Sequence, residues 1–314
     1  MQKKEFTIES RDGKKTPVHC VEYIPEGDPV CILQIAHGMA EYIGRYAPFM
    51  EWLCGQGFLV IGEDMLGHGG TAATKEDLGF FCDTDPATVV VRDIHRLKKT
   101  VQEQYPGVPI FILGHSMGSF VIRNYICRYG TGIQGAVIMG TGMTPSSVLK
   151  FTQGLASMQE KMFGSHHPAK MIDRMAFASY NKKIPNARTK FDWLSVNREN
   201  VDRYIADPLC GFLFSVNGFQ TLFELAARLH LPEYLDKMPK DLPVLFVSGM
   251  EDPVGAYGTA VTEVYRSFLD QEHMTDVSMK LFDGDRHEIL NEDNHEEVYQ
   301  YVRDWILSRI PHKA

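Results

Sequence analysis

The chain has 314 residues, of which 44% are hydrophobic and 23% charged, the balance of a globular protein with a large core. This length allows one α/β domain with an insertion, or two average domains, and it excludes a miniprotein held together by disulfides or metal ions. With 32 Lys and Arg against 40 Asp and Glu, the net charge is −8, so the sequence offers no basic field for nucleic acid or an anionic membrane. We therefore expect no nucleic-acid partner.

The N-terminal stretch is charged throughout, and no run approaches the roughly 18 apolar residues that a membrane-spanning helix needs. The sequence therefore predicts a cytoplasmic protein without a transmembrane segment. The six cysteines form no CxxC pair and mostly lie in apolar runs, so we interpret them as reduced core residues. They are Cys20, Cys31, Cys54, Cys82, Cys127 and Cys210.

Strand and helix patterns alternate along most of the chain. Two β-rich segments, 6–9 and 18–23, flank an Asp12-Gly13 turn signal and predict an antiparallel hairpin. Short, almost wholly apolar runs follow at 30–36, 58–62, 110–113, 136–139, 244–247 and 277–282, as is typical of parallel strands covered on both faces. Helical periodicity appears after Pro86 and over 298–306. Together these patterns predict an α/β fold with a mostly parallel, doubly wound sheet.

The alternation fails between residues 142 and 208, where helical fragments rich in Met, Phe and Tyr are broken by glycine and prolines. This stretch is too long for a structureless loop in a compact domain. We interpret 143–208 as an inserted helical cap, and 1–142 with 209–314 as one core domain. A further helix is expected over 216–229.

The sharpest motif is Gly114-His115-Ser116-Met117-Gly118, which ends one apolar run and precedes an apolar helical stretch. Flanking glycines remove Cβ atoms that would clash in a tight strand-to-helix turn. A serine there lies at a helix N-terminus, where backbone N–H groups favour developing negative charge. This context predicts that Ser116 is a nucleophile.

A nucleophilic serine needs a histidine as base and a carboxylate to orient that histidine. Asp252 follows the run 244–247 and His287 follows the run 277–282, which places both at one edge of the sheet. Pro253 favours Asp252, because it holds that residue in extended backbone. Three nearby carboxylates stay open as alternatives: Glu251, Asp283 and Asp285.

Acyl transfer also needs two N–H donors aimed at the developing oxyanion. One is expected from the residue after the nucleophile, Met117, and the other from the loop His37-Gly38-Met39 that follows the run 30–36. We therefore expect the backbone N–H groups of Met39 and Met117 to form an oxyanion hole.

A glycine-rich stretch at 62–70 suggests a phosphate or metal site at first sight. It lacks the Lys-Ser/Thr ending of a phosphate-binding loop, and one His with one Asp does not make a zinc site. We interpret it as a turn organised by the side chains of Asp64 and His68.

Taken together, these motifs resemble the monoacylglycerol lipase and lysophospholipase branch of the α/β-hydrolases, which also resembles serine aminopeptidases. The motifs that carry the resemblance are His37-Gly38-Met39-Ala40-Glu41, Asp64-Met65-Leu66-Gly67-His68-Gly69, Gly114-His115-Ser116-Met117-Gly118, Asp252 and His287. The resemblance implies Ser116 as nucleophile, Asp252 and His287 as its partners, Met39 and Met117 as oxyanion donors, and a helical cap over the pocket. Ala40 and Tyr42 depart from the family pattern His-Gly-x-Gly-Glu-His.

The leading hypothesis is a serine hydrolase of carboxylic esters that needs no metal or cofactor and acts through an acyl-enzyme on a lipid-like or small acyl substrate. Apolar residues of the cap region are candidates to line an acyl channel: Met143, Leu149, Phe151, Leu155, Met158, Met162, Phe163, Phe212, Phe214 and Phe219. Closer to the nucleophile, His37, Gly38 and His115 are candidate substrate contacts. The oligomeric state is not predicted.

Two other functions stay open. An aminopeptidase or amidase on the same scaffold would need an acidic anchor for the substrate's amine, and the cap offers Asp173, Asp192, Glu199 and Asp202. A catalytically inactive hydrolase fold that binds a ligand is less favoured, because binding makes no demand for nucleophile, base, acid and oxyanion loop together. Dehalogenase or epoxide hydrolase chemistry is disfavoured, since those enzymes carry a carboxylate where Ser116 stands.

Overall fold

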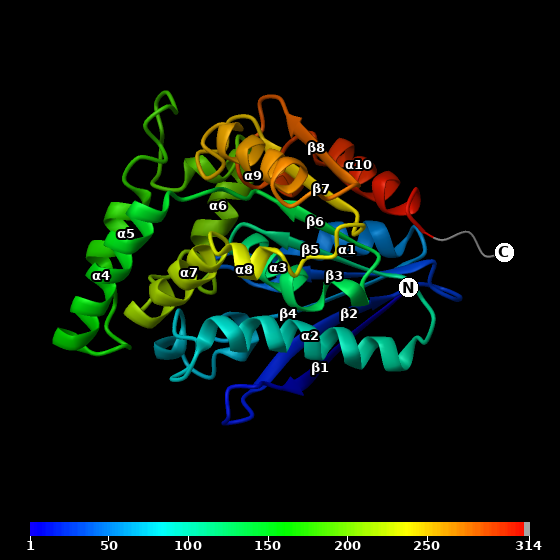
Figure 1. Ribbon diagram of the computed structural model, residues 1–314, viewed down its shortest axis with the longest axis horizontal. Helices are drawn as coiled ribbons and strands as arrows, with labels where there is room; N and C mark the ends of the chain where they lie inside the picture. Colours follow the sequence, from blue (N-terminus) through cyan, green and yellow to red (C-terminus); the bar gives the residue numbers. More distant parts are fainter. Residues whose placement is uncertain (311–314) are drawn as a thin grey trace.

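The computed structural model describes residues 1–310, and its centre is one eight-stranded sheet (Figure 1). The strand order is β1-β2-β4-β3-β5-β6-β7-β8. β2 pairs antiparallel with β1 and with β4, and the remaining neighbours are parallel. The strands are β1 Gln2–Glu9, β2 Pro17–Ile24, β3 Cys31–Ala36, β4 Phe58–Glu63, β5 Ile110–His115, β6 Gly135–Met139, β7 Val244–Gly249 and β8 Val277–Phe282.

Helices cover both faces of the sheet, which confirms the doubly wound architecture. Side chains of α1 and α10 form the core on one face, and those of α2, α3 and α9 form the core on the other. The helices are α1 Ala47–Cys54, α2 Pro86–Gln104, α3 Met117–Tyr129, α4 Ser146–Phe163, α5 Lys170–Phe177, α6 Arg198–Ala206, α7 Val216–Arg228, α8 Pro232–Leu235, α9 Thr259–Asp270 and α10 His295–Leu307. Short 3-10 helices cover Ile43–Tyr46, Gly69–Thr71, Lys75–Asp77, Gly130–Gly132, Asp192–Leu194 and Ile289–Asn291.

The N-terminal hairpin is confirmed, and its turn is organised as the sequence suggests. The carboxylate of Asp12 accepts a hydrogen bond from the Lys14 backbone N–H at 2.8 Å, and Gly13 takes a φ of +83°. One strand differs from the expectation of full burial: five of the six β8 side chains are only partly buried. The physical reason is that β8 forms the edge of the sheet, so it lacks a neighbour on one side.

The segment between β6 and β7 holds α4 to α8, and Figure 1 shows α4 and α5 at the left end of the sheet. α7 packs against α4 and also against α2 and α3, so it joins these outer helices to the helices that cover the sheet. All six cysteines are buried, unpaired thiols, as the sequence indicates. Within residues 1–310, none of the helices combines the length and hydropathy of a membrane-spanning segment.

Glu63 is a buried acid at the end of β4. Its side chain is 1% exposed, and neither carboxylate oxygen has a hydrogen-bond partner among residues 1–310. Burial raises the pKa of Glu63 well above its usual value of 4.5, and the nearby carboxylates of Asp93 and Asp64 raise it further. The folded protein therefore keeps a proton that the unfolded chain releases. This contribution to stability is fully present below pH 4.5 and is lost as the pH rises through the folded-state pKa.

We expect Glu63→Gln to raise the free energy of unfolding at pH 8 by about 1–3 kcal/mol, because the amide, unlike the carboxyl group, does not have to take up a proton when the chain folds. The gain over wild type should shrink at pH 5, where the wild-type carboxyl also holds its proton. Urea unfolding at both pH values measures the effect, with the exposed Glu76→Gln as control. Equal gains at the two pH values would contradict the assignment of a buried, protonated acid.

Candidate active site

Ser116 lies alone between β5 and α3 in a strained backbone conformation, with φ +54° and ψ −119°. Such a conformation costs roughly 1–3 kcal/mol in a residue with a Cβ atom. The Ser116 N–H donates to the Met139 carbonyl at 3.0 Å, which holds the turn against β6. A Cβ on Gly114 would come within 2.3 Å of the Gly118 carbonyl, and one on Gly118 within 2.2 Å of the Ala36 carbonyl. Both glycines are therefore required for this sharp turn.

Asp252 and His287 meet on the loops that follow β7 and β8. The Nδ1 atom of His287 lies 2.9 Å from Oδ2 of Asp252, and the two side chains are 2% and 0% exposed. Asp252 also accepts hydrogen bonds from the Val254 N–H at 2.8 Å and from the Ser248 hydroxyl at 3.2 Å, so its orientation is fixed. The other ring nitrogen of His287, Nε2, is buried and has no partner within residues 1–310. It is therefore free to accept a proton from a group in the adjoining cavity.

Two other aromatic rings pack near the His287 ring. The Trp193 ring centroid lies 5.1 Å from that of His287, and the His115 ring centroid lies 4.7 Å away. His115 Nε2 is 3.2 Å from the His287 carbonyl oxygen, which links the residue before Ser116 to the loop that carries His287. The position of His287 thus depends both on His115, next to the turn at Ser116, and on Trp193 of the inserted segment.

Glu41 organises the loop after β3. Its Oε1 accepts hydrogen bonds from the Gly38 N–H at 2.6 Å and the Tyr46 hydroxyl at 2.7 Å, and it lies 3.2 Å from His115 Nδ1. Burial disfavours the His115 cation, but the hydrogen bond to Glu41 and the negative charges of Glu41 and Glu288 together outweigh burial and raise the pKa of His115 above its usual value. The pKa of Glu41 is lowered in return, because His115 and Arg45 together outweigh its burial.

A buried ion pair connects this loop to the histidine loop and to α6. Arg45 donates to both carboxylate oxygens of Glu288, at 2.5 and 2.8 Å, and also to Glu41 and Asn200. Asn200 donates in turn to Glu288 at 2.6 Å. Sequence reasoning missed this network. The signals available were the four-residue spacing of Glu41 and Arg45 and the position of Glu288 next to His287.

The two expected oxyanion donors both line the cavity that contains Ser116. The Met117 N–H is at the first position of α3, where no intrahelical acceptor exists, and the Met39 N–H has no acceptor among the described residues. A Cβ on Gly38 would lie 2.5 Å from Glu41 Oε1 and 3.1 Å from the Ser116 Cβ, so a glycine favours the close approach of this loop to the turn at Ser116. Both N–H groups are therefore available near Ser116.

The two departures from the family pattern have a structural role. Ala40 adopts a φ of +53°, and its carbonyl accepts hydrogen bonds from the Gly211 N–H at 2.9 Å and the Tyr204 hydroxyl at 3.1 Å. The Tyr42 hydroxyl donates to Asp207 at 2.9 Å. Both residues thus fasten the loop after β3 to the segment that ends the insertion.

A cavity of about 880 Å³ opens over Ser116 and His287. Gly38, Met39, His115, Met117 and Phe151 also line it, as the sequence interpretation requires. Its outer walls come mainly from α4, α5 and α7 and are largely apolar. The apolar lining residues are Phe120, Val148, Leu149, Phe151, Leu155, Ile172, Phe177, Phe191, Trp193, Leu194, Phe212, Leu213, Phe219, Leu222, Phe223, Ala226 and Val254.

Two candidate substrate contacts are not placed in this cavity. His37 is fully buried: its Nε2 accepts the Met65 N–H at 2.9 Å and its Nδ1 lies 2.8 Å from the Gly38 carbonyl, so it joins two loops. Met143 precedes α4 and packs against the core. Several residues of the expected acyl channel also lie elsewhere, because one face of α4 points to solvent and Phe214 belongs to the core. The solvent-exposed ones are Met158, Met162 and Phe163.

The glycine-rich stretch after β4 is a turn organised by side chains, as the sequence indicates. Asp64 accepts hydrogen bonds from the Ile43 N–H at 2.8 Å and the Gly70 N–H at 2.7 Å. His68 Nδ1 lies 3.0 Å from the Leu66 carbonyl, and burial lowers the pKa of His68 to about 3, so this ring is neutral. The stretch supports the loop after β3.

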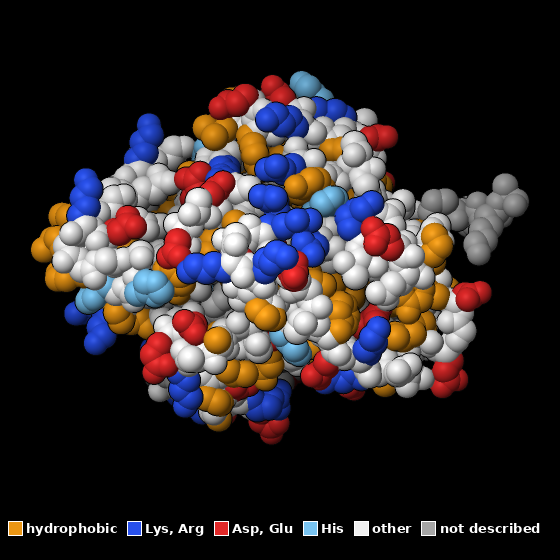
Figure 2. Space-filling view, turned by 90° about the horizontal axis from the view of Figure 1, so that it is seen from below, with side chains coloured by type: hydrophobic (Ala, Val, Ile, Leu, Met, Phe, Trp, Pro, Cys, Tyr) orange, Lys and Arg blue, Asp and Glu red, His pale blue; other side chains and the backbone are white. Residues whose placement is uncertain are grey.

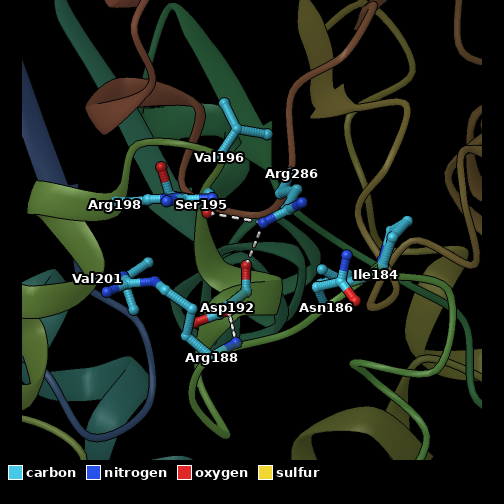
Figure 3. Close-up of a pocket in the computed structure, with 10 residues that line it drawn as sticks. Ile184, Asn186, Arg188, Asp192, Ser195, Val196, Arg198, Val201 and Arg286 are labelled. Carbon is cyan, nitrogen blue, oxygen red and sulfur yellow. Dashed lines mark hydrogen bonds between the residues drawn. The ribbon is translucent and has the colours of Figure 1, made fainter.

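A second, smaller cavity of about 140 Å³ lies behind the histidine loop (Figure 3). Arg286 points across it, and its Nη1 donates to the carbonyl oxygens of Asp192 and Ser195, at 2.8 and 3.0 Å. Its Nε lies 3.9 Å from the exposed carboxylate of Glu251. Arg188, also in this cavity, pairs instead with Asp202 on the surface. Arg286, the residue directly before His287, is therefore bound to the inserted segment through these two carbonyl groups.

We expect Arg286→Met to lower kcat about tenfold to a hundredfold, since small misplacements of a catalytic base have effects of this size. Two carbonyl groups would lose their donor, so the free energy of unfolding should fall by about 1–3 kcal/mol. Steady-state kinetics on a short ester and thermal unfolding measure the two effects. Arg188→Met is the matched control, and an equal kcat for both variants would show that Arg286 does not position His287.

Strand order, the strained serine turn, and the Asp252–His287 pair after β7 and β8 define an α/β-hydrolase. The family model described as serine aminopeptidase, S33, matches residues 27–294, and the chain belongs to this family. Within it, the chain is an α/β-hydrolase of the monoglyceride lipase-like branch, consistent with the resemblance of its motifs.

Individual relatives cover almost the full chain. The monoglyceride lipase of Mus musculus is 27% identical over 303 residues, which cover 93% of this chain and 87% of the relative. The monoacylglycerol lipase of Mycolicibacterium smegmatis is 26% identical over 299 residues, covering 92% of each. Among solved structures, a thermostable carboxyl esterase from Bacillus coagulans in complex with glycerol superposes with a TM-score of 0.90 at 29% identity, covering 99% of this chain and 100% of the esterase.

Proposed function

We propose that the protein is a serine hydrolase of carboxylic esters that acts on lipid-like monoacyl substrates through an acyl-enzyme. The observation that carries the proposal is the His287 ring. One ring nitrogen is held by Asp252, and the other is buried without a partner beside a cavity that Ser116 lines. This is the arrangement that a general base for serine requires.

In the proposed reaction, His287 Nε2 takes the hydroxyl proton as Ser116 Oγ bonds to the ester carbonyl carbon. The carbonyl oxygen becomes an oxyanion and receives hydrogen bonds from the Met39 and Met117 N–H groups. The bond to the alcohol oxygen breaks, and His287 gives its proton to the departing alcohol. Water then attacks the acyl-enzyme, again with His287 as base, and the carboxylic acid and the serine hydroxyl are restored. Asp252 orients the ring and stabilises its cation throughout.

Three features support a lipid-like acyl group. The cavity walls are largely apolar, the volume is in the range of sites for drug-sized or longer ligands, and several relatives are named as lipases of monoacylglycerols. Three large apolar side chains of α4 and α5 that line the cavity are also exposed at its opening: Val148, Phe151 and Met175. A small-molecule ester is therefore the partner we propose.

We also propose that 143–208 acts as a cap on a core formed by 1–142 and 209–314. α4 and α5 supply cavity walls, whereas the serine, acid and histidine all come from loops at the sheet. Substrate choice would then rest on the cap, and the chemistry on the core.

An aminopeptidase is the second candidate, favoured by the family description and by one carboxylate. Of the four acidic residues that the sequence offered as an amine anchor, Asp173 lines the cavity. Asp192 accepts hydrogen bonds from the Thr189 hydroxyl and the Arg188 backbone N–H. Asp202 forms an ion pair with Arg188 and does not line the cavity over Ser116.

Two measurements test the proposal and separate these candidates. A fluorophosphonate probe should label wild-type protein at Ser116, and absence of labelling would favour the inactive, ligand-binding alternative. Initial rates on acyl esters of increasing chain length should exceed rates on aminoacyl anilides at equal concentration. Faster cleavage of the anilides would replace the esterase proposal with the aminopeptidase.

A further inference from the structure

The loop after β8 buries three carboxylates close to His287. On the face seen in Figure 2, Asp and Glu side chains lie at the surface among Lys and Arg. Asp285, Glu288 and Glu292, in contrast, are 4%, 3% and 0% exposed. Glu288 is paired with Arg45, whereas Glu292 has no cationic partner among residues 1–310. Because a buried carboxylate is costly unless other groups compensate it, the surroundings of Glu292 indicate its role.

Four hydrogen-bond donors from two segments of the chain bind the Glu292 carboxylate. Its Oε1 atom accepts the Arg286 backbone N–H at 2.9 Å. Its Oε2 atom accepts the Ser195 hydroxyl at 2.6 Å and the backbone N–H groups of Val196 and Asn197 at 2.9 and 3.2 Å. The carboxylate therefore joins the loop after β8 to the turn before α6.

The backbone is held on both sides of His287. The N–H of the residue before His287 donates to Glu292, and the N–H of the residue after it, Glu288, donates to the Leu194 carbonyl at 2.7 Å. The turn that contributes these contacts also carries Trp193, whose ring packs near the His287 ring. The direction of the imidazole therefore depends on this turn as well as on the carboxylate that binds Nδ1.

Glu292 itself is out of reach of a bound substrate, because it lines neither the cavity over Ser116 nor the smaller cavity. Any effect on a reaction at Ser116 must pass through the backbone that carries His287. A misplacement of a catalytic group by about 1 Å can lower a rate about 100-fold, so such an effect is measurable.

We propose that Glu292 is a positioning residue for His287. Its carboxylate fixes the backbone of the loop so that His287 Nε2 meets first the Ser116 hydroxyl and then the oxygen of the departing alcohol. This inference rests on the proposed esterase function and adds to it a residue that contacts no substrate.

Glutamine tests the carboxylate at nearly constant volume. A carboxylate only accepts hydrogen bonds, whereas the amide of Glu292→Gln turns an NH₂ group toward groups that are themselves donors. Ser195→Ala is a milder second variant that removes one of the four donors. Burial raises the pKa of Glu292 while its donors favour the ionised form, so the rates are measured at pH 8.

The test compares two butyrate esters that place different demands on His287. Ethyl butyrate needs a proton from His287 as its alcohol departs, whereas p-nitrophenolate departs from p-nitrophenyl butyrate without one. We expect Glu292→Gln to lower kcat/KM about 100-fold for the ethyl ester and about tenfold for the p-nitrophenyl ester. Ser195→Ala should change the ratio of the two rates in the same direction, by about threefold. All rates are divided by the fraction of protein that a fluorophosphonate labels.

Asp93 on α2 provides the matched control, because it is a buried carboxylate with similar donors. It is 2% exposed, accepts the Ser10 hydroxyl at 2.5 Å and the Arg11 N–H at 2.7 Å, and lines neither cavity. Asp93→Asn should keep the wild-type ratio of the two rates even where thermal unfolding shows a loss of stability.

Several outcomes would overturn the proposal. Equal losses on both esters in Glu292→Gln would show a general loss of structure, and the same change of ratio in Asp93→Asn would assign the effect to stability. If Glu292→Gln does not fold, an unchanged ratio in Ser195→Ala decides against the proposal. If wild type cleaves neither ester and does not react with a fluorophosphonate, the esterase function itself fails, which is distinct from a loss confined to the variants.

Discussion

Ser116→Ala should reduce ester hydrolysis by about 10⁵-fold to 10⁶-fold, because the proposed acyl-enzyme forms on the Ser116 hydroxyl. The fold should be unaffected, since the Ser116 hydroxyl makes no hydrogen bond within residues 1–310 and alanine keeps the same strained backbone. kcat/KM on a short soluble ester and loss of fluorophosphonate labelling measure the effect. Undiminished activity in this variant would remove Ser116 from the mechanism.

A second substitution separates chemistry from strain at the same position. Ser116→Gly should be as inactive as the alanine variant, but glycine adopts positive φ without cost, so the free energy of unfolding should rise by about 1 kcal/mol. Ser147→Ala, on the exposed start of α4, is the matched control and should leave both activity and stability unchanged. A destabilised glycine variant would show that the turn is not strained in solution.

Asp252→Asn should lower kcat about 10⁴-fold while the structure stays intact. An amide can donate to His287 Nδ1 and so favours the tautomer with the proton on Nε2, which cannot accept the serine proton. The amide oxygen can still accept the Val254 N–H, so the loop after β7 should keep its shape. Steady-state kinetics together with thermal unfolding distinguish lost chemistry from lost folding.

The neighbouring acids provide the control for this second variant. Asp283→Asn, at an exposed position in the loop after β8, should have wild-type kinetics, because the structure pairs His287 with Asp252 instead. A large loss of kcat in Asp283→Asn together with a small loss in Asp252→Asn would assign the orientation of His287 to Asp283 instead of Asp252.

Strands and turns were the parts that local sequence could predict well. The run 110–113 and the motif around Ser116 each depend on neighbours a few residues away: a buried strand needs apolar residues on both faces, and a tight turn needs glycine. β8 shows the limit. Its largely apolar run, interrupted by Ser278 and Lys280, predicts a strand with the observed bounds, but its position at the sheet edge depends on pairing with β7.

The cap was harder to predict from sequence, because helical periodicity does not say what each face of a helix meets. Phe151 and Met162 lie on the same helix and are both exposed, yet Phe151 lines the cavity and Met162 does not. His37 illustrates the opposite error. Its position in the motif suggested a substrate contact, but hydrogen bonds to a loop 28 residues away make it a buried support.

The sequence by itself predicted the fold class, the tight turn at Ser116 and the pairing of Asp252 with His287, because each depends on residue type next to a strand end. Only the tertiary structure decided how the site is supported and what its cavity presents. Arg45, Glu41 and Glu288 are separated by up to 247 residues in the chain and become neighbours only when the loops after β3 and β8 meet. The net charge of −8 likewise hid the buried carboxylates beside His287, because a sum over the chain carries no information about where the charges lie.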